Sequence, residues 1–191
     1  MAASLLILAG CNKINHGNAS PFDAVGMHPE SIEQLHKYQV NDAEVQQILA
    51  AGSAGMTEQD CVELVRIARS RDRVFAEGDI VAGLLGAGVK ESTIMELVRL
   101  DELNGYGGEA EAMHLANLSD EVILDVARRR VKGEKVLSGA RLAELRDAGF
   151  SNSQLVAELD RGITDQQAQQ VIAHHDYAAG GHSFVHQPRR R

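Results

Sequence analysis

The chain has 191 residues, a net charge of −8 and a hydrophobic content of 44%, values that suit one soluble domain or a short array of repeats. The acidic charge has the wrong sign for attraction to nucleic-acid phosphates, and an aromatic content of only 4%, with no Trp, argues against base-stacking and sugar-binding surfaces. Two cysteines are too few for a disulfide framework or a zinc site.

The chain begins with a short apolar segment, LLILAGC (Leu5–Cys11), after which the sequence turns polar at once. Its last four residues, Leu8-Ala9-Gly10-Cys11, resemble the lipobox of bacterial lipoproteins. The resemblance implies that residues 1–10 are a signal segment removed by a signal peptidase and that the thiol of Cys11 carries a diacylglycerol. The protein would then face the periplasm or the exterior, attached to the membrane by lipid.

An apolar N-terminus with an incidental cysteine is the alternative, because a signal peptide normally opens with Lys or Arg and residues 1–4 contain neither. The protein would then be cytoplasmic. Residues 11–30 contain turn formers and little apolar periodicity, so we expect the lipid-bearing Cys11 to be followed by a flexible tether.

One apolar pattern occurs three times, in SIEQLHKYQVNDAEVQQIL from Ser31, IVAGLLGAGVKESTIMELV from Ile80 and RLAELRDAGFSNSQLVAEL from Arg141. Each copy predicts a helix, a tight turn and a second helix. Gly88 and Gly149 supply the left-handed residue that ends a helix, and Ser151 has capping-box spacing. The shared columns are Ile32/Val81/Leu142, Leu35/Leu84/Leu145, Val40/Val89/Phe150, Val45/Ile94/Leu155 and Leu49/Val98/Leu159.

A further helix is expected after each pair, capped by Thr57, Ser119 and Thr164 in turn. The sequence therefore predicts an all-α fold in which three units of short helices, at about 31–74, 78–131 and 137–176, form a solenoid-like array or a compact helical bundle.

Two segments stand outside this pattern. Residues 101–116 (DELNGYGGEAEAMHLA) are rich in Gly and acidic residues, so we expect an inserted, exposed loop with some helix. Residues 177–191 combine Gly, His and a final Arg189-Arg190-Arg191, and we expect a disordered tail.

The repeat domain offers no catalytic constellation, cofactor motif or small-molecule site. Cys61 occupies a column filled elsewhere by Ile123 and Ala168, which predicts a buried thiol. The stretch VAGLLGAGVKESTIMEL resembles a DNA-reading helix-turn-helix, but its second helix offers few groups that read base edges. Those residues are Glu91, Ser92, Thr93, Met95 and Glu96, with Asn152, Ser153, Gln154 and Glu158 in the next copy.

The C-terminal histidines are the only cluster of metal-ligating residue types in the sequence: His174, His175, His182 and His186. His182 and His186 would share one face of a helix, but Gly180-Gly181 and Pro188 disfavour a helix there. We therefore expect no metal, and a metal-binding envelope protein remains an alternative.

The combined expectation is a non-catalytic protein-binding or scaffolding module of the bacterial cell envelope. Its partners would be the membrane, through the lipid at Cys11, and an unidentified protein, with no nucleic acid. The alternative is a cytoplasmic helical adaptor or regulator, of which DNA binding is the less favoured form.

Overall fold

The computed structural model describes residues 20–180, and within them the side chains other than those of Ala24 and 176–180. These residues form one short 3-10 helix and ten α-helices, with no strand among them, which confirms the all-α prediction. The elements are η1 (Pro21–Val25), α1 (Pro29–Lys37), α2 (Asp42–Ser53), α3 (Glu58–Ser70), α4 (Gly78–Ala87), α5 (Glu91–Arg99), α6 (Leu103–Leu115), α7 (Asp120–Val131), α8 (Gly139–Asp147), α9 (Asn152–Asp160) and α10 (Asp165–Gly180).

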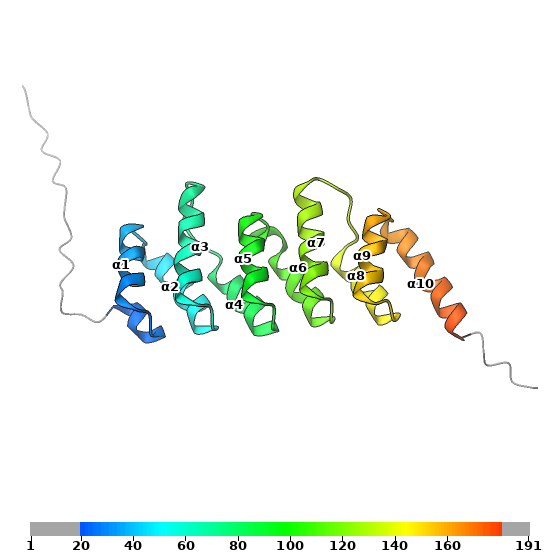
Figure 1. Cartoon of the computed structure of the whole chain (residues 1–191), viewed down its shortest axis with the longest axis horizontal. Helices are drawn as coiled ribbons and strands as arrows, with labels where there is room; N and C mark the ends of the chain where they lie inside the picture. Colours follow the sequence, from blue (N-terminus) through cyan, green and yellow to red (C-terminus); the bar gives the residue numbers. More distant parts are fainter. Residues whose placement is uncertain (1–19, 181–191) are drawn as a thin grey trace, which may run out of the picture.

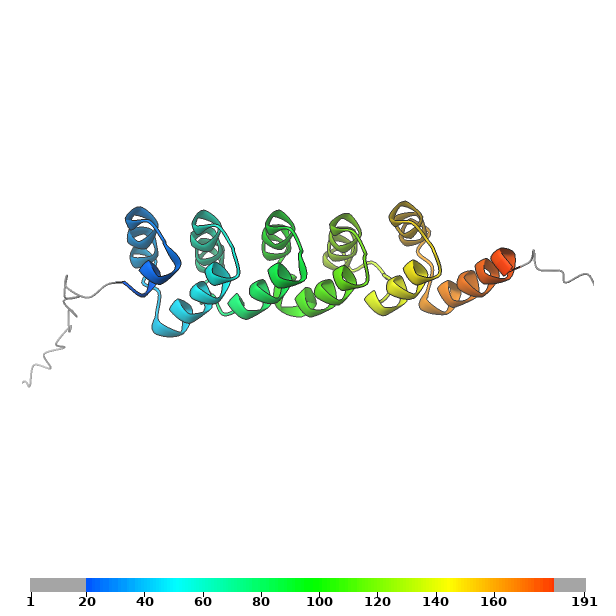
Figure 2. The same ribbon diagram turned by 90° about the horizontal axis from the view of Figure 1, so that it is seen from below.

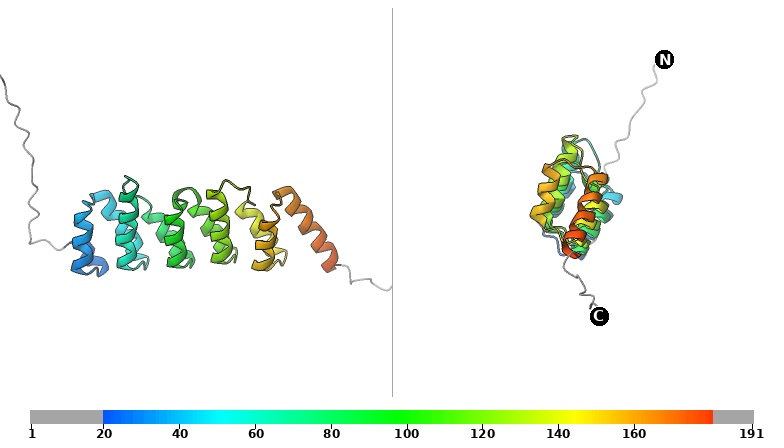
Figure 3. Two further views of the ribbon diagram at one scale, coloured as in Figure 1. Left: turned by 45° about the horizontal axis from the view of Figure 1, so that its top comes forward. Right: turned by 90° about the vertical axis from the view of Figure 1, so that its right-hand side faces the viewer.

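The helices are arranged in two layers. The odd-numbered helices stand side by side in one row and the even-numbered helices form a second row (Figures 1 and 2). Within each layer a helix packs on the helix two positions further along the chain, and the even helices touch one another more extensively than the odd ones. Seen along its length, the molecule is two helices deep (Figure 3). The fold is therefore an elongated α-solenoid.

Five tight turns of one kind lead from the even layer to the odd layer. In each, a residue with φ between 61° and 106° ends the first element. The next residue is apolar and buried, and its N–H donates to the carbonyl five residues earlier, which is the Schellman arrangement. The five pairs are Gly26-Met27, Gly55-Met56, Gly88-Val89, Asn117-Leu118 and Gly149-Phe150.

The connections from the odd layer back to the even layer also contain one residue of positive φ each, namely Gln39, Asp72, Asp101, Gly133 and Gly162. The connections at 71–77 and 132–138 are longer than the others and follow the long helices α3 and α7. Long and short helix pairs therefore alternate. The chain returns to an equivalent position after four helices, since α4 begins at Gly78 and α8 begins 61 residues later at Gly139.

The division into three units of three helices is not confirmed. The copies from Ile80 and Arg141 cover α4–α5 and α8–α9, which both run from the even layer to the odd layer. The copy from Ser31 covers α1–α2, which runs from odd to even, so its alignment with the others is one helix out of phase. The error has a local cause: Gln39 adopts a φ of 53° and ends α1 in the left-handed region, as Gly88 ends α4.

The prediction of an exposed loop at 101–116 is wrong, because most of this segment is α6. Tyr106, Ala110 and Met113 on this helix are buried, and the Tyr106 hydroxyl donates to the carbonyl of Ile123 at 3.2 Å. The glycines that indicated a loop are packing positions: a Cβ on Gly107 would overlap the side chain of Ile80 on α4. Without α6 the even layer would lack its central helix.

The described parts of the expected tether and tail contain helix. Within 11–30, the part that the structure describes contains η1, which packs on α2 and buries Phe22, and Met27 is buried as well. At the other end α10 continues to Gly180, four residues into the expected tail. Residues 1–19 and 181–191 lie outside the described part of the chain.

Glycine at the start of two even helices lets the layer pack closely. A Cβ on Gly78 of α4 would overlap the carbonyl group of Gln47 on α2, and one on Gly139 of α8 would lie 2.9 Å from Met113 of α6. Contacts that short force a neighbouring group to move. These positions explain why the even helices contact one another more extensively than the odd helices.

Candidate interaction surface

The lipid-attachment candidate Cys11 and the candidate ligands His182 and His186 lie outside the described residues. Cys61 is buried, as predicted. Burial, together with the charges of the nearby carboxylates Glu91, Asp60 and Glu58, raises the pKa of its thiol to about 12. A thiol with this pKa is protonated at neutral pH and does not act as a nucleophile.

The two described C-terminal histidines have different surroundings. His174 is exposed on α10, whereas His175 is half-buried, with its ring centroid 4.8 Å from that of Phe150. Among the side chains that the structure describes, which do not include that of Asp176, no three of His, Cys, Asp or Glu are grouped so that they could hold a metal ion. Between residues 20 and 180, no helix has the length and apolar character to cross a membrane.

The helix-turn-helix candidate has its second helix, α5, between α3 and α7 in the odd layer. Thr93 and Met95, two of the residues considered for reading bases, are 3% and 1% exposed. They contribute to packing. Thr93 donates from its hydroxyl to Asp120 on α7 at 3.2 Å.

A repeated hydrogen bond joins the N-terminal ends of neighbouring odd helices. In each case the backbone N–H of one helix's N-cap residue donates to the side chain of the first residue of the next odd helix. The four donor–acceptor pairs are His28 to Glu58 at 2.7 Å, Thr57 to Glu91 at 2.7 Å, Lys90 to Asp120 at 3.3 Å and Ser119 to Asn152 at 3.3 Å. Acidic acceptors there also offset the positive ends of parallel helix dipoles.

Carboxylates crowd one another along this edge. Burial raises the pKa of Asp60, and the adjacent Glu91 raises it further by its charge and a hydrogen bond. Glu91 is already engaged with the Thr57 amide, so these acids hold helix ends together.

Arginines form the corresponding contacts at the C-terminal ends of the odd helices. Arg71 donates to the carbonyls of Val98 and Arg99 at 2.9 and 2.8 Å, and Arg129 donates to the carbonyl of Leu159 at 3.3 Å. These are the last carbonyls of α5 and α9, which have no partner within their own helix. The cations on this edge therefore stabilise the array.

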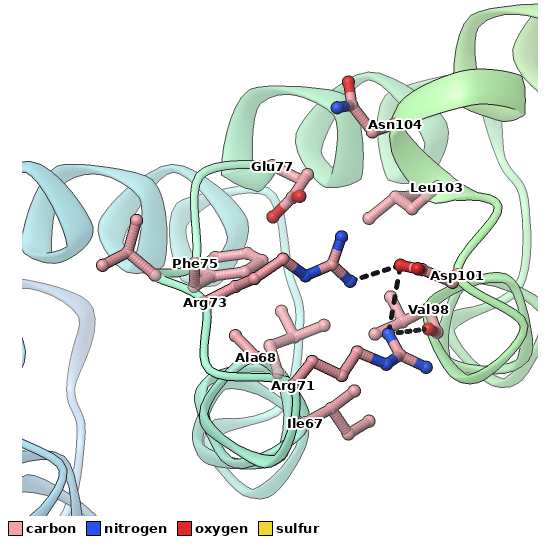
Figure 4. A pocket seen from close by; sticks show the side chains of 12 residues that line it. Ile67, Ala68, Arg71, Arg73, Phe75, Glu77, Val98, Asp101, Leu103 and Asn104 are labelled. Carbon is pink, nitrogen blue, oxygen red and sulfur yellow. Dashed lines mark hydrogen bonds and ion pairs between the residues drawn. The ribbon is translucent and has the colours of Figure 1, made fainter.

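A small pocket lies beside this edge, between α3, the connection at 71–77 and the start of α6 (Figure 4). Arg73 reaches into it toward Asp101, which also pairs with Arg71 at 3.3 Å. Its free volume is about 30 Å³, which suits one or two water molecules. Both arginines in its lining pair with Asp101, so the pocket is a junction between helices.

The outward side of the even layer has a different composition. We call it the even face and define it by one row of exposed or half-exposed residues, three or four positions apart, on each of α2, α4, α6 and α8. They are Gln46, Leu49, Ala50, Ser53, Asp79, Ala82, Gly83, Gly86, Gly108, Glu111, Ala112, Leu115, Ala140, Ala143, Glu144 and Asp147. Half of them are Ala or Gly, and all four charged members are acidic. The half-exposed Arg141 and Arg146 of α8 lie beside this row.

This surface does not follow from the sequence prediction, because residues 101–116 have the composition of a loop and α6 is one of the helices that form it. The available signal was the charge of the segments: α2, α4, α6 and α10 contain no Lys or Arg. The lysines and arginines of the odd helices and of the connections after them alternate with these cation-free segments along the chain.

No protein-family model matches the chain. Neither a curated protein nor a solved structure shows significant similarity to it.

Proposed function

We propose that this chain is a non-catalytic protein-binding or scaffolding module, held at the bacterial cell envelope by a lipid on Cys11. The observation that carries the binding role is the even face, a surface that extends over four helices. At the ends of the odd helices, charged side chains such as Arg71 and Glu91 are engaged in contacts with the neighbouring helix. On the even face, Glu144 pairs with Arg141 and Asp79 bonds to Gln47. Glu111 and Asp147 form no ion pair with another side chain that the structure describes, so they are available to a partner.

Burial of the reactive groups supports a non-catalytic role. The Cys61 thiol has a pKa raised to about 12, and burial also raises the pKa of the Tyr106 phenol. Neither group ionises near neutral pH, so neither supplies a nucleophile or a base. A solenoid provides a long surface with little enclosed volume, which suits binding to a macromolecule.

The binding role is tested by photo-crosslinking in the native cell. A crosslinking amino acid replaces Ala112 on the even face or Gln59 on the exposed side of α3 in the odd layer. We expect one discrete adduct from position 112 and none from position 59. Equal patterns from both positions would contradict a binding role for the even face.

The anchor is tested separately by metabolic labelling with a fatty acid. We expect the wild-type chain to be labelled. The Cys11→Ser variant should carry no label and should be released from the membrane fraction. A wild-type product that keeps Met1 and stays in the cytoplasm would sink the anchor and favour the cytoplasmic adaptor.

A further inference from the structure

We propose that the even face binds a cationic amphipathic helix of a partner protein. The inference rests on the proposed function, because it specifies the partner of the same surface.

The charge of the even face favours a cationic partner. Its charged members, Asp79, Glu111, Glu144 and Asp147, come from three consecutive even helices. The only cations on the even helices are on α8. Arg141 pairs there with Glu144, and Arg146 donates to the carbonyls of Asn117 and Phe150. A predominantly acidic surface of this kind attracts and orients an oppositely charged segment.

The shape of the even face favours a helix. Small residues at the outward positions, such as Ala82, Gly83 and Gly86 on α4 and Gly108 and Ala112 on α6, leave the layer shallow enough for another helix to approach closely. Helices pack about 8–10 Å apart, so four of them present a surface about 30 Å long. A partner helix of about 20 residues spans that length.

The even face also has an apolar anchor, at the C-terminal end of α6. Leu115 at the end of α6 is 65% exposed, which is the largest exposure among the bulky apolar side chains that the structure describes. The residue at the corresponding point of α4, two positions before the left-handed glycine, is Gly86. An apolar side chain surrounded by small and acidic residues matches one face of an amphipathic helix that also carries Lys or Arg.

A second copy of this chain is a poor occupant. A two-fold contact through the even face would place the same patch on both sides, and Glu111 and Asp147 of one copy would then meet acidic groups of the other. Like charges that meet at an interface oppose association. A partner with the opposite charge is therefore favoured.

The probe for the test is a fluorescent 18-residue Lys/Leu peptide designed as an amphipathic helix, with a Glu/Leu peptide of the same pattern as its control. Binding to the full chain is measured by fluorescence anisotropy at 150 mM salt. Glu111→Lys/Asp147→Lys is compared with Glu33→Lys/Glu121→Lys, which makes the same change in net charge with exposed residues of the odd layer. Leu115→Ser tests the anchor, and thermal unfolding confirms that each variant folds.

We expect the Lys/Leu peptide to bind and the Glu/Leu peptide not to bind. Glu111→Lys/Asp147→Lys should weaken binding about tenfold and Leu115→Ser about fivefold, whereas Glu33→Lys/Glu121→Lys should change it less than twofold. Equal losses in the two charge variants would overturn the inference, because they would show attraction to the chain's overall charge. Binding that survives both even-face variants would also overturn it.

The chain's own Arg189-Arg190-Arg191 is the competing occupant. If replacement of these three arginines by alanine tightens peptide binding about tenfold, the even face is covered by this segment and the partner helix is rejected. If the peptide does not bind but crosslinking from position 112 still gives a discrete adduct, only the cationic helix is rejected. Absence of that adduct would reject the proposed function itself.

Discussion

The carboxylate of Glu44 and the guanidinium of Arg69 form a bidentate ion pair, with both N–O distances at 2.7 Å. Glu44 lies in the first turn of α2 and Arg69 in the last turn of α3, so the pair joins the two layers. Glu44 is 1% exposed, and its oxygens also accept the backbone N–H groups of Asn41 and Phe75. One buried side chain thereby connects α2, α3 and the connection at 71–77.

Replacement of Glu44 should destabilise the whole array. Glu44→Ala leaves the Arg69 guanidinium and the Phe75 amide without their acceptor, and we expect a loss of about 3 kcal/mol in the free energy of unfolding. Glu44→Gln retains one oxygen and should lose about half as much. Urea unfolding followed by circular dichroism measures both.

The matched control is Glu33→Ala, which removes a Glu33–Lys37 pair with a distance of 3.0 Å in which both side chains are 68% exposed. An exposed pair contributes little, so this change should stay within about 0.5 kcal/mol. Equal losses at Glu44 and Glu33 would show that the buried pair contributes no more than an exposed one.

The same pair predicts a loss of stability in acid. Burial alone would raise the pKa of Glu44, but the hydrogen bonds from Arg69, Phe75 and Asn41 together lower it below its usual value of 4.5. A lowered folded-state pKa contributes stability that is fully present above the unfolded-state pKa and is lost as the pH falls through the folded-state pKa. The wild type should therefore lose stability below about pH 4.5, measured as the unfolding midpoint in urea.

Glu44→Gln has no carboxyl group at this position and should show a shallower decline between pH 5 and pH 3 than the wild type. Parallel curves for the two proteins would refute the assignment. Glu33→Gln is the control that should leave the slope unchanged.

The close contact between α2 and α4 predicts opposite effects for two glycines in one helix. Gly78→Ala would place a Cβ against the backbone of Gln47, and we expect a loss of about 3 kcal/mol because backbone has to move. Gly86 lies in the same helix with no atom within 4 Å of a Cβ placed there, so Gly86→Ala should stabilise by about 0.5–1 kcal/mol. Thermal or urea unfolding measures the change in stability of each variant. Equal changes for Gly78→Ala and Gly86→Ala would argue against close packing at Gly78.

The environment of Cys61 predicts that its thiol is inert in the folded protein. With its pKa raised to about 12, the thiolate fraction at pH 8 is small, and burial blocks access as well. We expect iodoacetamide at pH 8 to leave Cys61 unmodified in the native chain and to modify it fully in urea. Intact-mass analysis of the Cys11→Ser variant reports on Cys61 alone. Rapid native labelling would show that α3 opens readily.

Local sequence features determined most of the helices. The cap at Thr57 and the left-handed glycines at 88 and 149 are short-range signals. Gly or Asn, an apolar residue and a cap recur as GMH at 26–28, GMT at 55–57, GVK at 88–90, NLS at 117–119 and GFS at 149–151, where the chain passes from the even layer to the odd layer. The same pattern occurs as GIT at 162–164, where the chain passes back, so the motif alone does not give the phase of the repeat. The first occurrence, GMH, lies in the segment that was expected to be a tether.

Only the tertiary structure decided which helices are neighbours. Gln39 and Gly88 make similar local turns, yet one leads to the even layer and the other to the odd layer, and no local signal distinguishes them. In the sequence, Gly107 and the glycines near it indicate a loop. Only the packing of α4 against α6 shows that Gly107 leaves room for the side chain of Ile80. The even face arises in the same way: Glu111 and Asp147 become one surface only when α6 and α8 pack side by side. Capping and periodicity act within a few residues, whereas layers and surfaces depend on contacts about 30 residues apart, which no short stretch of sequence contains.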